Sequence, residues 1–332
     1  MEPNLAAQAA SRVKLLAKGN RADLARVLTI LSYGDDRTDA LAGQLALSAA
    51  PGRVISITGP PGAGKSTLVS AMLTALRKRG LPVAVLAIDP SSPLTGGGIL
   101  GDRIRMERHT DDLGVFVRSL GARNHGDGIA DNLPAMIDAM AIAGWPLVLV
   151  ETVGVGQSET GVFKLADISI LVSVPGLGDD VQTMKAGVLE LADIHVVNKS
   201  DLPGADIVAR QLKGMLRLRG ASGAQPPVLT TDATTGQGVD ELLDAIEGIG
   251  FGERTGGRRA RIEAQIESRV HRAVKNELAD ALRQCSKSIS QAADGAIHIQ
   301  TVAQAVTIRI AEGLKSSKYA GDLDVESNPL DT

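Results

Sequence analysis

Several residue types that often point to a function are scarce in this chain. One cysteine, Cys285, occurs in 332 residues, which excludes a disulfide within the chain and suits a reducing compartment. Aromatic residues make up only 2% of the sequence, so few side chains could stack on nucleic-acid bases. The net charge is −3, so no basic field attracts nucleic acid. We therefore expect no nucleic-acid partner.

Long apolar runs are also missing. No stretch approaches the roughly 18 consecutive apolar residues that a membrane-spanning helix needs, so we expect no membrane contact. The first residues, Met1 to Leu5, lack the basic region and the apolar core of a secretory signal, and we expect a cytoplasmic protein. The apolar content of 44% is enough for a sizeable core.

Between residues 51 and 250, short apolar runs alternate with segments of helical periodicity. Most of the short runs are continuously apolar, which suits parallel strands that are covered on both faces. The alternation predicts an α/β fold, a doubly wound and mostly parallel sheet that binds ligands at the carboxyl ends of its strands. The predicted strands are 53–58, 83–88, 114–118, 146–151, 168–174, 194–198 and 227–230, and the predicted helices are 66–79, 128–143, 178–191, 204–218 and 238–248.

Helical patterns flank this domain on both sides. Residues 1–50 carry apolar side chains at helical spacing and predict an N-terminal helical extension. After a glycine-rich linker, residues 258–315 carry a long apolar stripe at the same spacing. The stripe either packs back on its own domain or forms a dimer interface, and the pattern alone leaves both open. The polar residues 316–332 predict a disordered tail.

The most informative segment connects the first predicted strand to the first helix of the domain. Residues 59–67, GPPGAGKST, match the phosphate-binding P-loop. Glycines let backbone N–H groups turn toward phosphates, and the start of a helix adds unpaired donors. Lys65 is predicted to reach the β- and γ-phosphates and assist catalysis, and the Ser66 hydroxyl is predicted to bind Mg²⁺. The predicted phosphate contacts are Gly62, Ala63, Gly64, Lys65, Ser66 and Thr67.

A second motif, N-K-x-D, ends the predicted strand 194–198 and points to guanine. The Asp201 carboxylate can accept hydrogen bonds from guanine N1–H and from the 2-amino group. Adenine offers neither donor, so the buried charge would stay unpaired at a substantial cost. Asn198 and Lys199 are expected to brace this loop and flank the base. Alone, such a motif is more often a polar turn; together with an upstream P-loop, it predicts GTP and GDP as ligands.

Acidic residues at strand ends predict a metal site beside Ser66. Glu151 ends the strand 146–151, and Gly154 follows three residues later, which is the spacing of a Walker B and switch II segment; the Gly154 N–H would face the γ-phosphate. Asp89 ends the strand 83–88, and Asp102 lies in a glycine-rich loop that fits switch I. Mg²⁺ prefers few carboxylates together with water and phosphate oxygens. Whether Glu151 would bind it directly or through water stays open.

Taken together, five blocks resemble the MeaB/ArgK/MMAA family of P-loop GTPases: GPPGAGKST, DPSSP, GGGILGDRIRM, ETVGVGQSE and NKSD. The resemblance covers most of the chain. It implies a homodimer, joined through the C-terminal helices, that hydrolyses GTP. It also implies a chaperone that gates cofactor loading and protection of an adenosylcobalamin-dependent acyl-CoA mutase.

The same resemblance implies an extra switch at residues 175–185. Gln182 and Lys185 would approach the nucleotide when the mutase is bound, although by sequence alone Lys185 is an ordinary lysine on a helix surface. A lysine delivered to the phosphates would act like an arginine finger. Hydrolysis is therefore expected to be slow alone and stimulated by the mutase.

Two segments depart from the family pattern. After the strand 227–230 the chain has Thr231-Asp232-Ala233, where the Ala233 N–H can still contact guanine O6 but an acid at Asp232 puts the usual geometry in doubt. Residues 123–128 are also more polar than expected.

Two other functions remain as alternatives. A metallochaperone GTPase would need Cys or His ligands near the switches, which a single cysteine disfavours. A transport-linked ATPase or kinase is disfavoured by the N-K-x-D motif.

Overall fold

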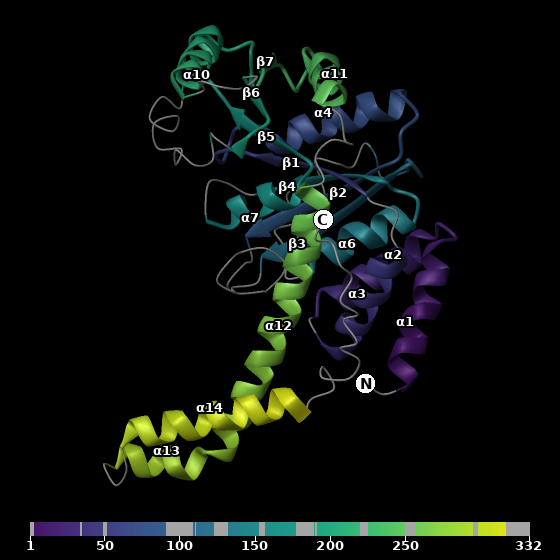
Figure 1. Cartoon of the computed structure of the whole chain (residues 1–332). Coiled ribbons are helices and arrows are strands. Elements are labelled where there is room, and N and C mark those ends of the chain that lie inside the picture. Colours follow the sequence, from purple (N-terminus) through teal and green to yellow (C-terminus); the bar gives the residue numbers. More distant parts are fainter. Residues whose placement is uncertain are drawn as a thin grey trace, which may run out of the picture. The chain divides into compact units, whose positions relative to one another are not determined.

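The structure is a computed structural model that describes residues 3–33, 35–48, 52–90, 109, 111–122, 132–152, 157–176, 189, 191–219, 225–249, 256–294 and 298–316. The chain divides into two compact units (Figure 1). The larger unit runs from Asn4 to Glu263, and the smaller one begins at Ala264.

A seven-stranded sheet with the order β3-β2-β4-β1-β5-β6-β7 forms the centre of the larger unit. Each neighbouring pair of strands is parallel. From β1 the chain moves outward to β2 and β3, returns to β4 beside β1, and then crosses to β5 on the other side. The carboxyl end of β1 thus lies where the strand order reverses, the place where such sheets bind ligands. The strands are β1 Arg53–Thr58, β2 Val83–Pro90, β3 Val115–Ala122, β4 Leu147–Glu151, β5 Ile168–Ser173, β6 Ile194–Asn198 and β7 Val228–Thr231.

Helices cover both faces of the sheet (Figure 1), which confirms the predicted doubly wound α/β fold. On one face lie α4 (Lys65–Lys78) and α11 (Val239–Ile249), and on the other lie α6 (Leu133–Ile142), α7 (Gln157–Leu165) and α10 (Ala205–Arg219). The nine-residue helix α7 was not predicted from the sequence, because so short a segment shows little periodicity. The predicted helix 178–191 falls almost entirely outside the described residues.

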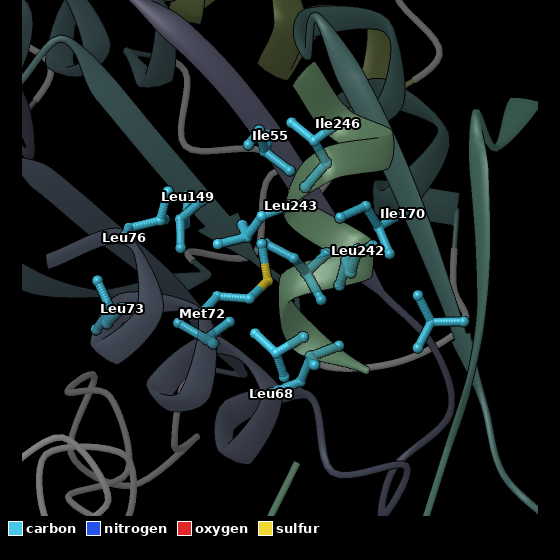
Figure 2. Packing of buried hydrophobic residues seen from close by; sticks show 14 of the residues in the cluster. Ile55, Leu68, Met72, Leu73, Leu76, Leu149, Ile170, Leu242, Leu243 and Ile246 are labelled. Carbon is cyan, nitrogen blue, oxygen red and sulfur yellow. The ribbon is translucent and has the colours of Figure 1, made fainter. Parts of the chain in front are cut away.

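The core between α4, α11 and the sheet fixes the start of α4 (Figure 2). Figure 2 shows side chains from both helices meeting the strand residues Ile55, Leu149 and Ile170. The contributing helix residues are Leu68, Met72, Leu73 and Leu76 of α4 and Leu242, Leu243 and Ile246 of α11. Because strand side chains alternate between faces, Ser56 and Thr58 point to the opposite side of β1 from Ile55. Leu68 and Val69, near the start of α4, belong to the same core, so packing holds the start of this helix beside the end of β1.

The N-terminal residues form the predicted helical extension, and the structure describes it as α1 Pro3–Leu16, α2 Arg21–Leu31 and α3 Asp36–Ser48. Asn20 caps α2, since its side-chain oxygen accepts a hydrogen bond from the Ala22 N–H at 2.8 Å. Both α2 and α3 contact α6. The buried Asn132 side chain, just before α6, donates to the Leu31 carbonyl at 2.7 Å. These helices are thus part of the larger unit.

The C-terminal residues form α12 (Gly256–Gln284), α13 (Ser286–Ala293) and α14 (Ile299–Ser316). A small core of Ala281, Cys285, Val302 and Val306 joins them. The predicted apolar stripe along α12 stays exposed where the structure describes it: its six side chains are 38–57% exposed, namely Ile262, Ile266, Val270, Val274, Leu278 and Leu282. Among the described helices, none combines the length and apolar character that a bilayer crossing requires.

A buried histidine on β6 makes the stability of the larger unit dependent on pH. His195 is fully buried, and its two ring nitrogens have no hydrogen-bond partner among the described residues. Burial lowers the pKa of His195 to about 4. The unfolded chain, with a histidine pKa near 6.5, then binds more protons than the folded one between pH 4 and 6.5. The contribution of His195 to the free energy of unfolding is therefore fully present above this pH window, and it is lost as the pH falls through the window.

We expect the His195 contribution to lower the free energy of unfolding by about 2 kcal/mol between pH 7 and pH 5. Urea unfolding of the wild type and of His195→Leu at both pH values measures this, and the variant should lose correspondingly less. His271→Gln, a change at an exposed position on α12, is the control and should follow the wild type. Equal losses in the wild type and in His195→Leu would contradict the assignment.

Candidate nucleotide-binding site

The predicted P-loop lies between β1 and α4, and its backbone requires glycine. Gly59, Gly62 and Gly64 have φ values of +151°, +79° and +82°. A Cβ atom on Gly64 would lie 2.6 Å from the Asn198 side-chain nitrogen, and one on Gly59 would lie 2.2 Å from the Val172 carbonyl oxygen. The helix begins directly after this loop, so its first N–H groups have no intrahelical acceptor. The arrangement offers an anion a ring of backbone donors.

Lys65 is buried and bends back over the loop that precedes it. Its ammonium donates to the carbonyl oxygens of Gly59 at 2.7 Å and of Pro60 at 3.1 Å. A buried ammonium needs such partners, because losing them would leave the charge desolvated. The charge is thus already held at the phosphate loop.

Ser66 and Glu151 meet at the carboxyl ends of two neighbouring strands. The Ser66 hydroxyl donates to Glu151 Oε1 at 2.5 Å, and both residues are buried. Glu151 pairs across the sheet with Ile57 of β1, so the strand register brings it to the P-loop. Because the Ser66 hydroxyl donates to the carboxylate, its oxygen can act as an acceptor of lone-pair type toward a cation. An all-oxygen donor set of this kind suits Mg²⁺.

A pair of threonines beside this contact was not foreseen from the sequence. The Thr152 hydroxyl donates to the Thr58 hydroxyl at 2.7 Å, and the Thr152 N–H donates to the Ile57 carbonyl at 3.1 Å. Thr58 immediately precedes the P-loop, and Thr152 immediately follows Glu151. Hydrogen bonds therefore connect the end of β1 to the end of β4. In the sequence, the only sign of this connection is that a threonine lies next to each motif.

Asn198 joins the phosphate loop to the predicted base loop. Its side-chain nitrogen donates to the Ala63 carbonyl at 2.9 Å. Its side-chain oxygen accepts hydrogen bonds from the Thr231 hydroxyl and from the Ala233 N–H, both at 3.1 Å. Next to it, Lys199 has φ +58° and is the one non-glycine residue with positive φ in the described part of the chain. Asp201 lies beyond these anchors and is exposed.

The carboxylate of Asp232 lies within its own turn. It accepts hydrogen bonds from the Thr235 hydroxyl at 2.7 Å and from the Thr234 N–H at 2.9 Å. These two bonds, that from Thr235 first, lower the pKa of Asp232. The sequence left open how an acid at this position would affect the base loop. In the structure, the Asp232 carboxylate is hydrogen-bonded within its own turn and closes it.

The other predicted site residues are only partly within the description. Asp89 is in β2, whose Ala87 pairs with Glu151, so its backbone belongs to the same sheet edge. Its side chain is not described. Asp102, Gly154, Gln182 and Lys185 lie outside the described residues.

Comparisons with known proteins identify the family. Residues 24–287 match the sequence profile of the methylmalonyl-CoA mutase-associated GTPase MeaB. A Pyrococcus abyssi protein is 44% identical over 267 residues, which are 78% of this chain and 82% of that protein. The GTPase ArgK of Escherichia coli is 37% identical and covers 77% of this chain and 80% of its own length. The crystal structure of an LAO/AO transport system kinase superposes with a TM-score of 0.63 at 27% identity, covering 92% of this chain and 98% of that one. This chain is a member of the MeaB family of methylmalonyl-CoA mutase-associated GTPases.

Proposed function

We propose that the protein is a GTP-hydrolysing chaperone that gates cofactor loading and protection of an adenosylcobalamin-dependent acyl-CoA mutase. The observation that supports this most is the match to the mutase-associated family over residues 24–287. That span includes every residue that the sequence assigned to nucleotide and metal.

The phosphate side of the site is formed by Gly62 to Thr67. Backbone N–H groups bind the phosphates, and Lys65 exchanges its bonds to the Gly59 and Pro60 carbonyls for bonds to phosphate oxygens. Ser66 would hold Mg²⁺ through its hydroxyl oxygen. Glu151 accepts a hydrogen bond from that hydroxyl, so it would orient the oxygen and add negative charge beside the metal. Asp89 and Asp102 complete the set of acids. When bound, Mg²⁺ neutralises phosphate charge.

The base side selects guanine. Asp201 accepts from N1–H and from the 2-amino group, and Lys199 lies against the base. Asn198 is not free to read the base with both side-chain atoms, since it links Ala63 to Thr231 and Ala233. It therefore keeps phosphate and base loops at a fixed separation, which sets the length of nucleotide that fits.

Regulation is assigned to the segments that carry Gly154, Gln182 and Lys185. The Gly154 N–H senses the γ-phosphate, and Lys185 neutralises charge in a loose transition state once the partner delivers it.

The C-terminal arm, residues 258–315, pairs with a second copy through the stripe on α12, because its exposed apolar side chains need a cover. Residues 1–50 and 51–250 form the N-terminal extension and the GTPase domain, respectively.

The test is GTP turnover by the full chain, alone and with a purified adenosylcobalamin-dependent acyl-CoA mutase. We expect slow turnover alone and at least about tenfold stimulation by the mutase, since a finger-type cation contributes about 10³–10⁵ in related systems. Lys185→Ala should remove most of the stimulation. Lys213→Ala, at an exposed position on α10, should leave it intact. Fast turnover without partner that Lys185→Ala does not change would contradict the proposal.

The contact between Ser66 and Glu151 gives a second prediction at this site. Glu151→Asp shortens the side chain by one methylene, so the carboxylate no longer reaches the Ser66 hydroxyl from its place on β4. We expect the Mg²⁺ concentration that half-saturates GTP hydrolysis to rise about tenfold, the usual cost of losing an outer partner of a metal ligand. Glu151→Gln keeps an oxygen for Ser66 and should cost less. An unchanged Mg²⁺ dependence in Glu151→Asp would mean that the contact does not orient Ser66.

A transport-linked kinase is the second candidate, because one solved relative is described as an LAO/AO transport system kinase. That function would require ATP at the base site. ATP is disfavoured by a carboxylate at Asp201, since adenine presents no donor to it.

A further inference from the structure

The turn that follows β7 is closed by one carboxylate. Asp232 Oδ1 accepts from the Thr234 N–H at 2.9 Å, and Oδ2 accepts from the Thr235 hydroxyl at 2.7 Å. The backbone closes the same turn, since the Asp232 N–H donates to the Gln237 carbonyl at 3.0 Å and the Gly236 N–H donates to the Asp232 carbonyl at 2.8 Å. Asp232 is only 8% exposed, so water competes little for these bonds.

Glycine is required where this turn meets β7. Gly236 and Gly238 have φ values of +84° and +78°. A Cβ atom on Gly238 would lie 2.1 Å from the Thr230 carbonyl oxygen. The backbone at Gly238 thus lies too close to the end of β7 to admit a side chain. This contact and the strand before Asp232 together fix the path of the turn.

The residue after Asp232, Ala233, is hydrogen-bonded to the loop of the proposed base site. The Ala233 N–H donates to Asn198 Oδ1 at 3.1 Å, and the same Asn198 side chain binds the phosphate loop at Ala63. The position of this N–H is therefore set from one side by Asn198 and from the other by the Asp232 turn. A backbone N–H can be shared between two acceptors, so it remains able to donate to a base oxygen.

The chemistry of guanine explains why the Asp232 charge must point away. Guanine presents an acceptor, O6, beside its N1–H and 2-amino donors. A free carboxylate near O6 would repel it, whereas a backbone N–H would bind it. In this structure both oxygens of Asp232 accept hydrogen bonds from donors of its own turn, so its charge is directed there. The donor proposed for O6 is then the Ala233 N–H, which it would share with Asn198 Oδ1.

We propose that Asp232 is a positioning residue for guanine recognition: together with Thr235 it holds the 232–237 turn so that the Ala233 N–H meets guanine O6, and it does not touch the base itself. The inference rests on the proposed binding of guanine nucleotides. Asp201 and Asp232 then have different roles. Asp201 accepts hydrogen bonds from N1–H and the 2-amino group of guanine, whereas Asp232 positions the Ala233 N–H that donates to O6.

The test compares the binding of GDP, IDP and ADP to the full chain with Mg²⁺, by isothermal titration calorimetry. IDP keeps O6 and N1–H and lacks only the 2-amino group. For Asp232→Ala we expect GDP and IDP affinities to fall by the same factor, about tenfold, the size of a lost hydrogen bond to a buried acceptor. For Asp201→Ala we expect the GDP affinity to fall more than the IDP affinity, so that the ratio of the two approaches one.

Further variants separate positioning from a general loss of structure. Asp232→Asn keeps an oxygen for the Thr234 N–H, and its amide can donate to the Thr235 hydroxyl, so the GDP affinity should recover to within about threefold of the wild type. Thr235→Val removes one bond and should weaken GDP and IDP binding equally. Asp240→Asn, an exposed position on α11, is the matched control and should bind as the wild type does. Thermal melting of each variant verifies folding, and a Thr235→Val protein that melts normally tests the idea even where Asp232→Ala does not fold.

Three outcomes would overturn the proposal while leaving guanine binding in place. These are unchanged GDP affinity in Asp232→Ala or in a folded Thr235→Val, a GDP-to-IDP ratio that collapses in Asp232→Ala, and an Asp232→Asn protein as weak as Asp232→Ala. A wild type that binds GDP and ADP equally would instead refute the proposed guanine site, and this inference with it.

Discussion

Replacement of Arg261 by methionine is expected to lower the free energy of unfolding by about 3–5 kcal/mol, the cost of breaking a buried ion pair by removing one partner. Arg261, in the second turn of α12, is only 5% exposed. Its guanidinium donates to the Leu165 carbonyl at 2.8 Å and to the Gly52 carbonyl at 3.2 Å, and lies 3.4 Å from both carboxylate oxygens of Asp167. Methionine would fill much of the volume and satisfy none of these acceptors.

The effect is large because Asp167 has a second task. Its Oδ2 accepts the Val54 N–H at 2.8 Å, and its N–H donates to the Val54 carbonyl at 2.9 Å. Without Arg261 this carboxylate, whose side chain is only 10% exposed, would lose its cationic partner while it still holds the start of β1, the strand that leads to the P-loop. Two backbone carbonyl groups would also lose their hydrogen-bond donor: that of Gly52, just before β1, and that of Leu165, at the end of α7.

Urea unfolding at pH 7 measures the loss, with Arg259→Met as the matched control. Arg259 lies on the same helix, but its side chain is 82% exposed and pairs with Glu263 at 2.8 Å. An exposed pair contributes at most about 1 kcal/mol, so the control should be nearly neutral. In the double variant Arg261→Met with Asp167→Asn, part of the stability should return, because no charge remains unpaired and the amide oxygen can still accept the Val54 N–H. A loss in Arg261→Met no larger than that in Arg259→Met would show that the guanidinium contributes little.

Replacement of Lys65 by alanine is expected to reduce GTP turnover at least about 10²–10³-fold, the effect of removing one preorganised group that stabilises developing charge. Lys65 is buried and already directed at the P-loop through the Gly59 and Pro60 carbonyls. Its ammonium is therefore positioned before the nucleotide arrives and needs little reorganisation. Alanine also leaves both carbonyls without this donor, so the loop itself should loosen.

Phosphate release at saturating GTP, together with the dissociation constant for GTP, separates the two effects. Lys65→Arg should not restore activity, because a planar guanidinium does not replace a compact ammonium in a closed loop. Lys78→Ala, at an exposed position in the last turn of the same helix, should retain normal turnover. Turnover in Lys65→Ala within about tenfold of the wild type would exclude the assigned role.

Much of the sheet could be predicted from the sequence because its strands are buried on both faces. Continuous apolar runs such as 83–88 have few other uses, and the observed β2 begins at the same residue. The predicted strand 194–198 has the same bounds as the observed β6. The N-terminal helices were predicted as well, since Leu24, Val27, Leu28 and Leu31 share a face and are buried together. In contrast, α7 was missed, because a helix of nine residues gains its stability from packing rather than from a visible period.

The sequence by itself determined which chemical groups are available: a glycine loop with a lysine and a serine, acids at strand ends, and the N-K-x-D motif. Only the tertiary structure decided which of them meet. Ser66 and Glu151 are 85 residues apart, Asn198 and Ala63 are 135 apart, and Arg261 and Gly52 are 209 apart. The reason is that a hydrogen bond depends on tenths of an ångström, and strand order and register set such distances between segments that carry no local record of each other. The same holds for Asp232, whose charge the sequence reveals and whose orientation, into its own turn, follows only from the path of the backbone.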